Sequence, residues 1–194
     1  MKQLKQFISE ALKINSKSKV VKTKHKVETK DELIGIIKDR YNKSTNRKLD
    51  CSDLDVSNVT DFSEIFKNCR KIETIDISGW DISNADSLEY MFASCNSLYY
   101  IIGLSDLDVS KVNYFDYMFC MCSSIKQLDL SNWKIDTANK PYITIIKMFA
   151  GCVMLKNIKG IEKFSGVYKA NAKDLFANNR YLNLNEIYKK LNLK

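Results

Sequence analysis

The sequence has very few of the residues on which several kinds of site depend. Only one histidine, one proline and six glycines occur among its 194 residues. This composition leaves too little material for a histidine-rich metal centre, a collagen-like segment or several phosphate-binding glycine loops. The sequence also contains no nucleophile elbow and no metalloprotease helix motif. We therefore expect a non-enzymatic protein with no cofactor and no metal site.

Long hydrophobic runs are also missing. No stretch approaches the roughly 18 to 20 apolar residues that a transmembrane helix requires. The first residues are basic, but Glu10 and Lys13 interrupt the apolar core that a secretion signal needs. On this basis we expect a cytoplasmic or virion location, in which the six cysteines are free thiols.

Positive charge is unevenly distributed along the chain. Residues 1–48 carry a formal charge of +9 and residues 49–194 carry −1. A contact with an anionic partner would thus depend on the N-terminal segment alone. The candidate residues for such a contact are Lys17, Lys19, Lys22, Lys24 and Lys26. Because no aromatic cluster accompanies these lysines, nucleic acid is a less favoured partner than another protein.

The central part of the chain is repetitive. A short motif recurs about every 26 residues, as Asp55–Asn58, Asp81–Asn84 and Asp108–Lys111. A fourth copy begins at Leu128, where the segment Leu128–Trp133 matches Ile75–Trp80 nearly position for position. Repetition at this period is typical of proteins built from stacked structural units.

The second half of each unit carries four apolar residues at the spacing i, i+3, i+4, i+7. This stripe is Phe62/Ile65/Phe66/Cys69, Leu88/Met91/Phe92/Cys95, Phe115/Met118/Phe119/Cys122 and Ile145/Met148/Phe149/Cys152, with a degenerate fifth copy at Ala172/Leu175/Phe176/Asn179. The spacing predicts a short amphipathic helix in each unit. Alternating residues such as Ile75-Asp76-Ile77 predict a short strand before it.

These patterns together predict an α/β fold, a leucine-rich-repeat-like solenoid of strand-turn-helix units of about 26 residues with helical caps. Neither a short strand nor a two-turn helix buries its apolar face alone, so neighbouring units must stack. We expect a leader over 1–20, an N-terminal cap of strand plus helix over 21–48, the solenoid over 49–182 and a cap helix over 183–194. Thr29 and Glu32 form a capping box before a stripe of Leu33, Ile36 and Ile37 in the N-terminal cap.

The repeat resembles a known family. Ile75–Asn84, followed by Met91-Phe92, Cys95 and Leu98, is similar to the repeat of the BspA-like leucine-rich-repeat family, which is also found in mycoplasma-type surface lipoproteins. The resemblance covers residues 49–182. It implies a non-catalytic interaction scaffold, often displayed on a cell surface.

The leader suggests a second interpretation. Residues 7–19 resemble short leaders in proteins of tailed phages of gut bacteria, which implies a virion-associated or packaged protein that uses residues 1–20 for attachment. Its candidate contact residues form one apolar helical face: Leu4, Phe7, Ile8, Ala11 and Leu12. A helix this short needs tertiary support, so packing on its own domain and fraying are the competing explanations.

The cysteines and aspartates that recur with the repeat have structural explanations. Cys69, Cys95, Cys122 and Cys152 share one repeat position and should line up inside the stack as small buried residues, too far apart to share one metal ion. Cys120 lies outside this column and is the better candidate for a reactive thiol. The aspartate pairs Asp53/Asp55 and Asp106/Asp108 recur at turns, where aspartate accepts hydrogen bonds from nearby amides.

Two tyrosines are the candidate contact residues for a protein partner. Tyr90 and Tyr117 occupy equivalent positions, each one residue before a methionine of the buried stripe, so they should point outward on adjacent units. The sequence therefore predicts a rigid, repeated surface that binds another protein, without identifying that protein or the oligomeric state.

Overall fold

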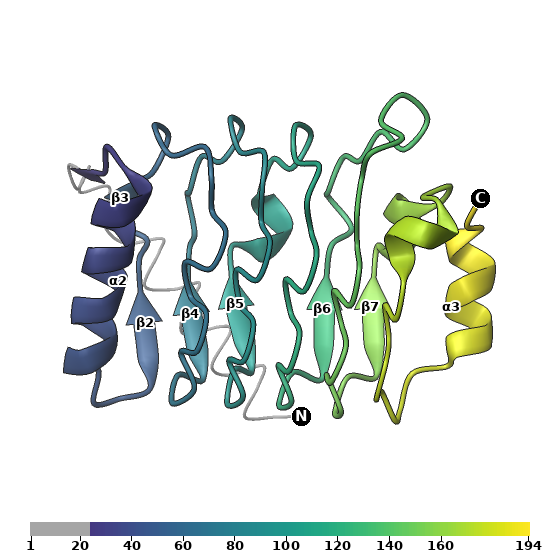
Figure 1. Ribbon diagram of the computed structural model, residues 1–194. Coiled ribbons are helices and arrows are strands. Elements are labelled where there is room, and N and C mark those ends of the chain that lie inside the picture. Colours follow the sequence, from purple (N-terminus) through teal and green to yellow (C-terminus); the bar gives the residue numbers. More distant parts are fainter. Residues whose placement is uncertain (1–23) are drawn as a thin grey trace.

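The computed structural model describes residues 24–194 as a single row of stacked coils between two helices (Figure 1). Each coil has a short parallel strand on one side and a turn segment on the other. We call these sides the strand face and the turn face. The coils run side by side along the row, so equivalent residues of successive repeats become neighbours.

The strand face consists of short parallel pairings. β2 (Lys48–Asp50), β4 (Thr74–Asp76) and β5 (Tyr100–Ile102) form one sheet in that order. β6 (Gln127–Asp129) pairs with β7 (Asn157–Lys159) in a second sheet. β1 (His25–Lys26) pairs with β3 (Leu54–Asp55) at the start of the row. The strands align repeat on repeat, with Leu49 beside Ile75 and Ile75 beside Ile101.

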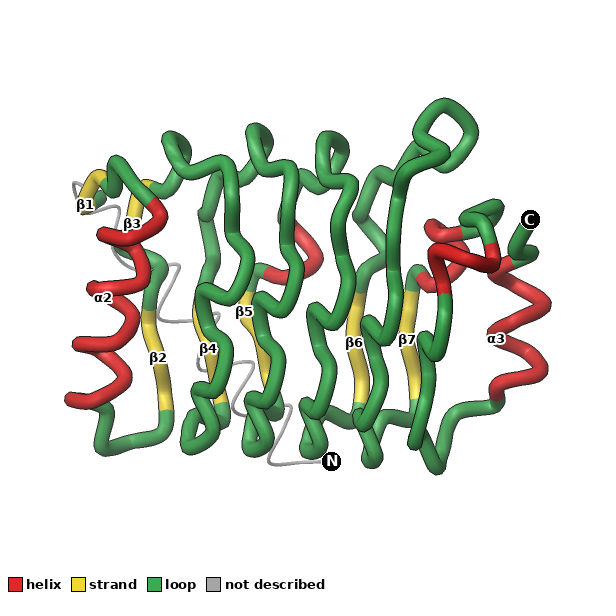
Figure 2. The backbone as a smooth tube through the Cα atoms, in the orientation of Figure 1, coloured by secondary structure: helices red, strands yellow, loops and turns green. Residues whose placement is uncertain are grey.

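The prediction of a helix in each unit is wrong. The apolar stripes lie in turn segments, which Figure 2 draws as loop. In the second turn segment, Met91 N–H donates to Leu88 C=O and Cys95 N–H donates to Phe92 C=O. The third residues of these two turns, Tyr90 and Ser94, have φ of 55° and 60°, as in type II turns. The chain is therefore too extended for an α-helix.

Backbone hydrogen bonds between coils replace those of the expected helices. Alternate amides of each turn segment donate to the next coil: Tyr90 N–H to Asp116 C=O at 2.9 Å, and Phe92 N–H to Met118 C=O at 2.9 Å. The same pattern joins Tyr117 to Ile146 and Phe119 to Met148. The turn face is consequently a continuous ladder across all five turn segments, which begin at Phe62, Leu88, Phe115, Ile145 and Ala172.

The predicted burial of the stripe residues is confirmed. Phe66, Phe92, Phe119, Phe149 and Phe176 stack in one column with centroid separations of 5.3 to 5.7 Å and interplanar angles of 4° to 7°. Trp80 stacks on Phe66 at one end of the column, and Tyr188 meets Phe176 edge-on at the other. This column forms the centre of the hydrophobic core.

The cysteine column is buried as predicted, and it also has a polar role. Three of the four thiols donate to the carbonyl of a phenylalanine in the preceding coil, each with a sulfur–oxygen distance of 3.0 Å: Cys95 to Phe66, Cys122 to Phe92, and Cys152 to Phe119. Asn179 takes over this role in the fifth coil and donates from Nδ2 to Phe149 C=O at 2.9 Å. The column therefore needs a small side chain with a hydrogen-bond donor.

The predicted turn role is confirmed for Asp55 and Asp108, whereas the Asp106 side chain accepts from the Ser105 hydroxyl at 3.2 Å. Asp55, Asp81 and Asp108 each accept from the backbone N–H two residues later, at 3.0 to 3.1 Å. These bonds lower the pKa of all three carboxyl groups. Asp53 instead accepts from both terminal nitrogens of the Arg40 guanidinium, at 2.6 and 2.9 Å.

Two helices cover the ends of the row. α2 (Lys30–Lys43) starts at the expected cap, where the Thr29 side chain accepts from Glu32 N–H, and it buries Leu33 and Ile37. α3 (Leu184–Leu191) begins after Asn183 and buries Ile187 and Leu191. Neither α-helix within residues 24–194 has the length and apolar character that a bilayer crossing needs.

Three single-turn 3₁₀ helices complete the fold. η1 (Leu104–Asp106) follows β5 on the strand face. η2 (Ile161–Phe164) and η3 (Lys169–Ala172) belong to the last coil, and η2 packs against α3.

Candidate functional site

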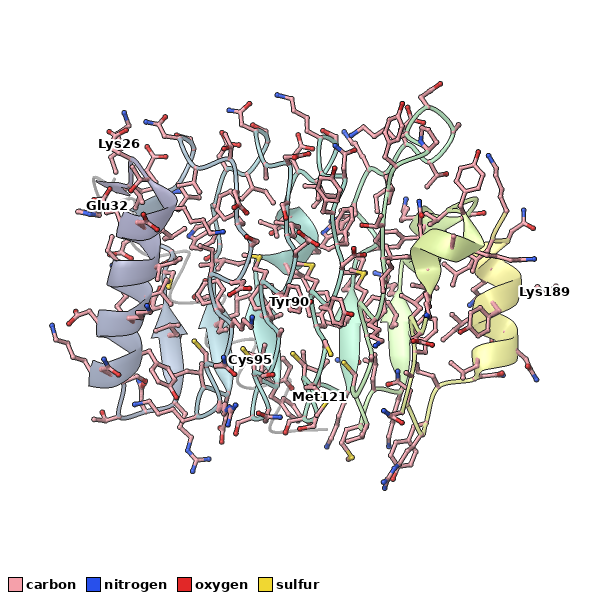
Figure 3. The ribbon with its side chains drawn as sticks, in the orientation of Figure 1. Lys26, Glu32, Tyr90, Cys95, Met121 and Lys189 are labelled. Atoms are coloured by element: carbon pink, nitrogen blue, oxygen red, sulfur yellow. The ribbon has the colours of Figure 1, made fainter. Side chains whose placement is uncertain are left out.

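The candidate site lies on the turn face, where Tyr90 and Tyr117 stand side by side. Their ring centroids are 4.5 Å apart and the rings are nearly parallel, at 6°. Both residues are held in the left-handed region, with φ of 55° and 57°, because each is the third residue of its turn. Figure 3 shows Tyr90 near the middle of this face. The rings are half-buried, so one side of the stack faces solvent.

Lysines extend the stack at both ends. Lys67 Nζ lies 4.7 Å from the ring centroid of Tyr90, and Lys147 Nζ lies 5.8 Å from that of Tyr117. A cation over an aromatic ring is attracted by the negative face of the π system. We call the set Lys67, Tyr90, Tyr117 and Lys147 the tyrosine strip. It crosses four consecutive coils.

Two carboxyl groups lie beside the tyrosine strip. Burial, together with the negative charge of Asp116, raises the pKa of Glu89. Burial also raises the pKa of Asp116, although its carboxylate accepts from Ile146 N–H at 2.6 Å. Burial disfavours the ionised form of both groups, so a cation placed against them would stabilise that form.

The tyrosine hydroxyl groups add hydrogen-bonding capacity. Burial, and secondarily the neighbouring Tyr117, raises the pKa of Tyr90. Tyr90 is consequently protonated at neutral pH and is able both to donate and to accept. The strip thus combines flat apolar area, two hydroxyl groups, two cations and a nearby anionic pair.

The structure brings together the two residues that the repeat pattern singled out as outward-facing neighbours. The flanking lysines were not predicted as part of the site. For Lys147 a signal existed, because it occupies the same repeat position as Tyr90 and Tyr117. Lys67 lies three residues after Glu64, its ion-pair partner at 2.9 Å, and only the coil geometry places it over the Tyr90 ring.

The predicted leader contacts are not described by the structure. Leu4, Phe7, Ile8, Ala11, Leu12, Lys17, Lys19 and Lys22 lie outside residues 24–194. The attachment and nucleic-acid interpretations that depend on them stay predictions. Lys24 and Lys26 are exposed, but they interact within the chain: Lys24 donates to Gly79 C=O, and Lys26 pairs with Glu28 at 3.2 Å.

The surroundings of Cys120 do not favour a reactive thiol, whereas a hydrogen bond with Cys95 lowers the pKa of Cys69. Burial raises the pKa of Cys120 above its ordinary range, so this half-buried thiol lacks the thiolate character of a reactive cysteine. Burial raises the pKa of Cys51 to about 12. Among residues 24–194, no group of three or more histidine, cysteine or acidic side chains is arranged to hold a metal ion.

Comparisons with known proteins identify the family. No curated protein matches the chain. Among solved structures, the crystal structure of a leucine-rich repeat protein from T. pallidum is similar over 53% of this chain, with 14% sequence identity and a TM-score of 0.28. The match spans 63% of that protein's length. The model of the family described as "Mycoplasma protein of unknown function, DUF285" matches residues 2–102 and again residues 99–189. The chain therefore belongs to this family of repeat proteins.

Proposed function

We propose that this chain is a leucine-rich-repeat-like solenoid that binds another protein through the tyrosine strip and has no catalytic activity of its own. The observation that carries the proposal is the stacked pair of Tyr90 and Tyr117 on the turn face. Membership of a repeat family is consistent with this role. Tyrosine is enriched at the energetic centres of protein interfaces, because it offers a large apolar area and a polar tip.

Rigidity supports the same role. The backbone of each tyrosine is fixed by a hydrogen bond to the next coil: Tyr90 N–H to Asp116 C=O at 2.9 Å, and Tyr117 N–H to Ile146 C=O at 2.8 Å. Ring stacking restricts the side chains as well. Little conformational entropy would be lost on association, so more of the contact energy would appear as affinity.

The charges beside the tyrosine strip indicate the chemistry of the partner. Glu89 and Asp116 lie close together and are poorly solvated, so a basic side chain of the partner would relieve their repulsion. Lys67 and Lys147 at the two ends would pair with acidic groups. We infer a partner surface with an apolar or aromatic centre and a basic residue next to it.

Affinity capture from the native source tests the proposal. The bait is the full chain, compared with a double variant carrying Tyr90→Asn and Tyr117→Asn. Asparagine is chosen because it tolerates the left-handed backbone at both positions. Tyr142→Asn is the control, because Tyr142 is 70% exposed and lies outside the strip. A protein captured by wild type and control but lost from the double variant supports the proposal. Equal capture by all three baits contradicts it.

A further inference from the structure

The strand face is interrupted between the third and fourth coils. β5 and β6 do not pair, although they follow one another in the stack, and they stand farther apart than the other neighbouring strands in Figure 1. The turn face is continuous at the same level, because Phe92 N–H donates to Met118 C=O and Phe119 N–H to Met148 C=O. The coils therefore splay apart on the strand face only.

The splay leaves two strand edges unpaired. Two backbone bonds show which residues of β5 face β4: Ile77 N–H donates to Ile102 C=O, and Tyr100 N–H donates to Glu73 C=O. Because successive residues of a strand direct their backbone groups to opposite sides, the N–H groups of Ile101 and Gly103 face β6. Leu130 N–H donates to Lys159 C=O in the other sheet. By the same alternation, the N–H groups of Gln127 and Asp129 face β5. Within the described residues, no backbone hydrogen bond joins 99–103 to 126–130.

A cavity of about 270 Å³ occupies this gap. We call it the strand slot. Its floor is apolar, formed by Ile101, Leu104, Ile125 and Leu128. Ile101 is half-buried, whereas the equivalent Ile75 in the intact sheet is fully buried. Its polar lining includes Tyr100, Gln127, Asn157 and the ion pair of Lys159 with Asp129, 3.0 Å apart.

Two contacts join the third and fourth coils beyond the ends of the strand slot. The third coil carries the extra turn η1, and the buried Trp133 side chain of the fourth coil donates from Nε1 to Leu104 C=O at 2.9 Å. At the other end, Lys126 Nζ lies 5.2 Å from the ring centroid of Tyr99. The two coils are thus connected beyond both ends of the slot and separated between them.

We propose that the strand slot binds an extended peptide segment of a partner protein, which inserts between β5 and β6 as an additional strand. Two facing edges offer N–H and C=O groups on both sides, and an extended backbone is the group that satisfies both at once. β5 and β6 have three residues each, about 10 Å of strand, so the segment needs only a few residues.

The floor of the slot defines the side chains of this segment. Because side chains alternate along a strand, one apolar residue would point inward onto Ile101 and Leu128, and its two neighbours would point out toward Tyr100 and Gln127. The expected sequence is therefore polar–apolar–polar. This proposal is separate from the tyrosine strip, which lies on the opposite face.

The experiment uses the full chain and a displayed library of random hexapeptides. Selected peptides are titrated against Gln127→Pro and Gln127→Ala. Both variants lose the same side chain, but only proline loses the N–H that faces the slot. Because the two variants lack the same side chain, we expect Gln127→Pro to bind at least about tenfold more weakly than Gln127→Ala. Selected peptides should carry the polar–apolar–polar pattern. The double variant with Tyr90→Asn and Tyr117→Asn should bind these peptides as wild type does.

Amide hydrogen exchange on the unmodified protein gives an independent readout if Gln127→Pro does not fold. We expect the amides of Ile101 and Gln127 to exchange rapidly in the free protein and to become protected when a selected peptide is added. The amide of Leu130 should be protected throughout. The proposal is wrong if no peptide is selected, or if bound peptides leave Ile101 and Gln127 unprotected. Protection of both amides in the free protein would mean that residues 1–23 or β5 and β6 themselves close the slot, and would also overturn it.

Discussion

Single side chains in this protein are selected by their position in the stack. The cysteine column shows this most directly, because four thiols and one asparagine amide occupy the same repeat position. In the three central coils the thiol donates to a phenylalanine carbonyl of the preceding coil. Each of these carbonyls also accepts a backbone N–H of its own turn, so the thiol is a second donor, and the column stabilises the stack through hydrogen bonds as well as through packing.

Removal of one thiol donor should be measurable. We expect Cys122→Ala to lower the free energy of unfolding by about 0.5–1.5 kcal/mol, because Phe92 C=O loses the thiol donor and keeps only its bond from Cys95 N–H. Cys122→Ser should lose less, since the hydroxyl group also donates. Urea denaturation measures both, with Cys120→Ala as the half-buried control outside the column. Equal loss in Cys122→Ala and Cys122→Ser would show that the hydrogen bond contributes nothing, and equal midpoints for wild type and Cys122→Ala would contradict any stabilising role of the thiol.

The carboxyl group of Glu89 gives a prediction for pH dependence. Its pKa is raised above 4.5 in the folded protein, so the folded state holds this proton to a higher pH than the unfolded state does. Ionisation of Glu89 therefore costs stability as the pH rises above its unfolded value. We expect Glu89→Gln to be more stable than wild type at about pH 7, with the difference vanishing near pH 4.

Glu28→Gln is the control for this measurement. The pKa of Glu28 is lowered, first by its hydrogen bond with Asn58 and then by Lys26, so its ionised form favours the folded state. This variant should be less stable than wild type at about pH 7, the opposite sign. Urea midpoints at both pH values decide the question, and the same sign for both variants would refute the assigned environments.

The turn segment explains why the repeat pattern predicts the buried positions but not the backbone conformation. Two consecutive four-residue turns bury residues at i, i+3, i+4 and i+7, which is also the pattern of an amphipathic helix. The buried positions were therefore predicted correctly and the backbone was not. Each turn segment has two residues with left-handed φ, its third and its seventh. Glycine or asparagine usually marks such a residue, but the third residue, the first left-handed position, is Glu64, Tyr90, Tyr117, Lys147 or Asp174. Only Asn68, Gly151 and Asn178 at the second position carried that signal.

The phenylalanine column should carry much of the stability of these elements. Phe119 stacks between Phe92 and Phe149, and we expect Phe119→Ala to cost about 3–5 kcal/mol by opening a core cavity. Phe176→Ala should cost less, because Phe176 has only one phenylalanine neighbour in the column and lies beside the exposed Tyr188. Thermal and urea denaturation report both values. The opposite order would contradict a column whose packing is tightest at its centre.

Contact between adjacent coils predicts a strong effect at Gly103. Its φ is +88°, and a Cβ there would lie 2.7 Å from Ser78 Cα in the preceding coil. We expect Gly103→Ala to destabilise the protein by about 2–5 kcal/mol, from left-handed strain and overpacking together. Gly35→Ala is the control, because nothing lies within 4 Å of that Cβ in α2, and it should stabilise by about 0.5–1 kcal/mol. Equal effects at both glycines would contradict the close approach of the second and third coils.

At the scale of the molecule, the row of coils and its end helices could be expected from the repeat and the capping signals. Thr29 and Glu32 mark the start of α2, and Leu184, Ile187 and Leu191 mark the stripe of α3. The break in the strand face could not be expected, because Gln127–Asp129 carries the same alternation of polar and apolar residues as the strands that pair. Likewise, the pairing of Tyr90 with Tyr117 was accessible from the repeat, whereas the position of Lys67 required the three-dimensional stack.

The whole molecule therefore presents two faces with different chemistry. The turn face is continuous and carries the tyrosine strip, and the strand face is divided and carries the strand slot. The central claim is that the turn face binds a protein through Tyr90 and Tyr117. Calorimetric titration of the captured partner tests it most directly. We expect the double variant with Tyr90→Asn and Tyr117→Asn to raise the Kd at least about tenfold, at unchanged thermal stability, while Tyr142→Asn binds as wild type does. An unchanged Kd for a folded double variant would contradict the claim.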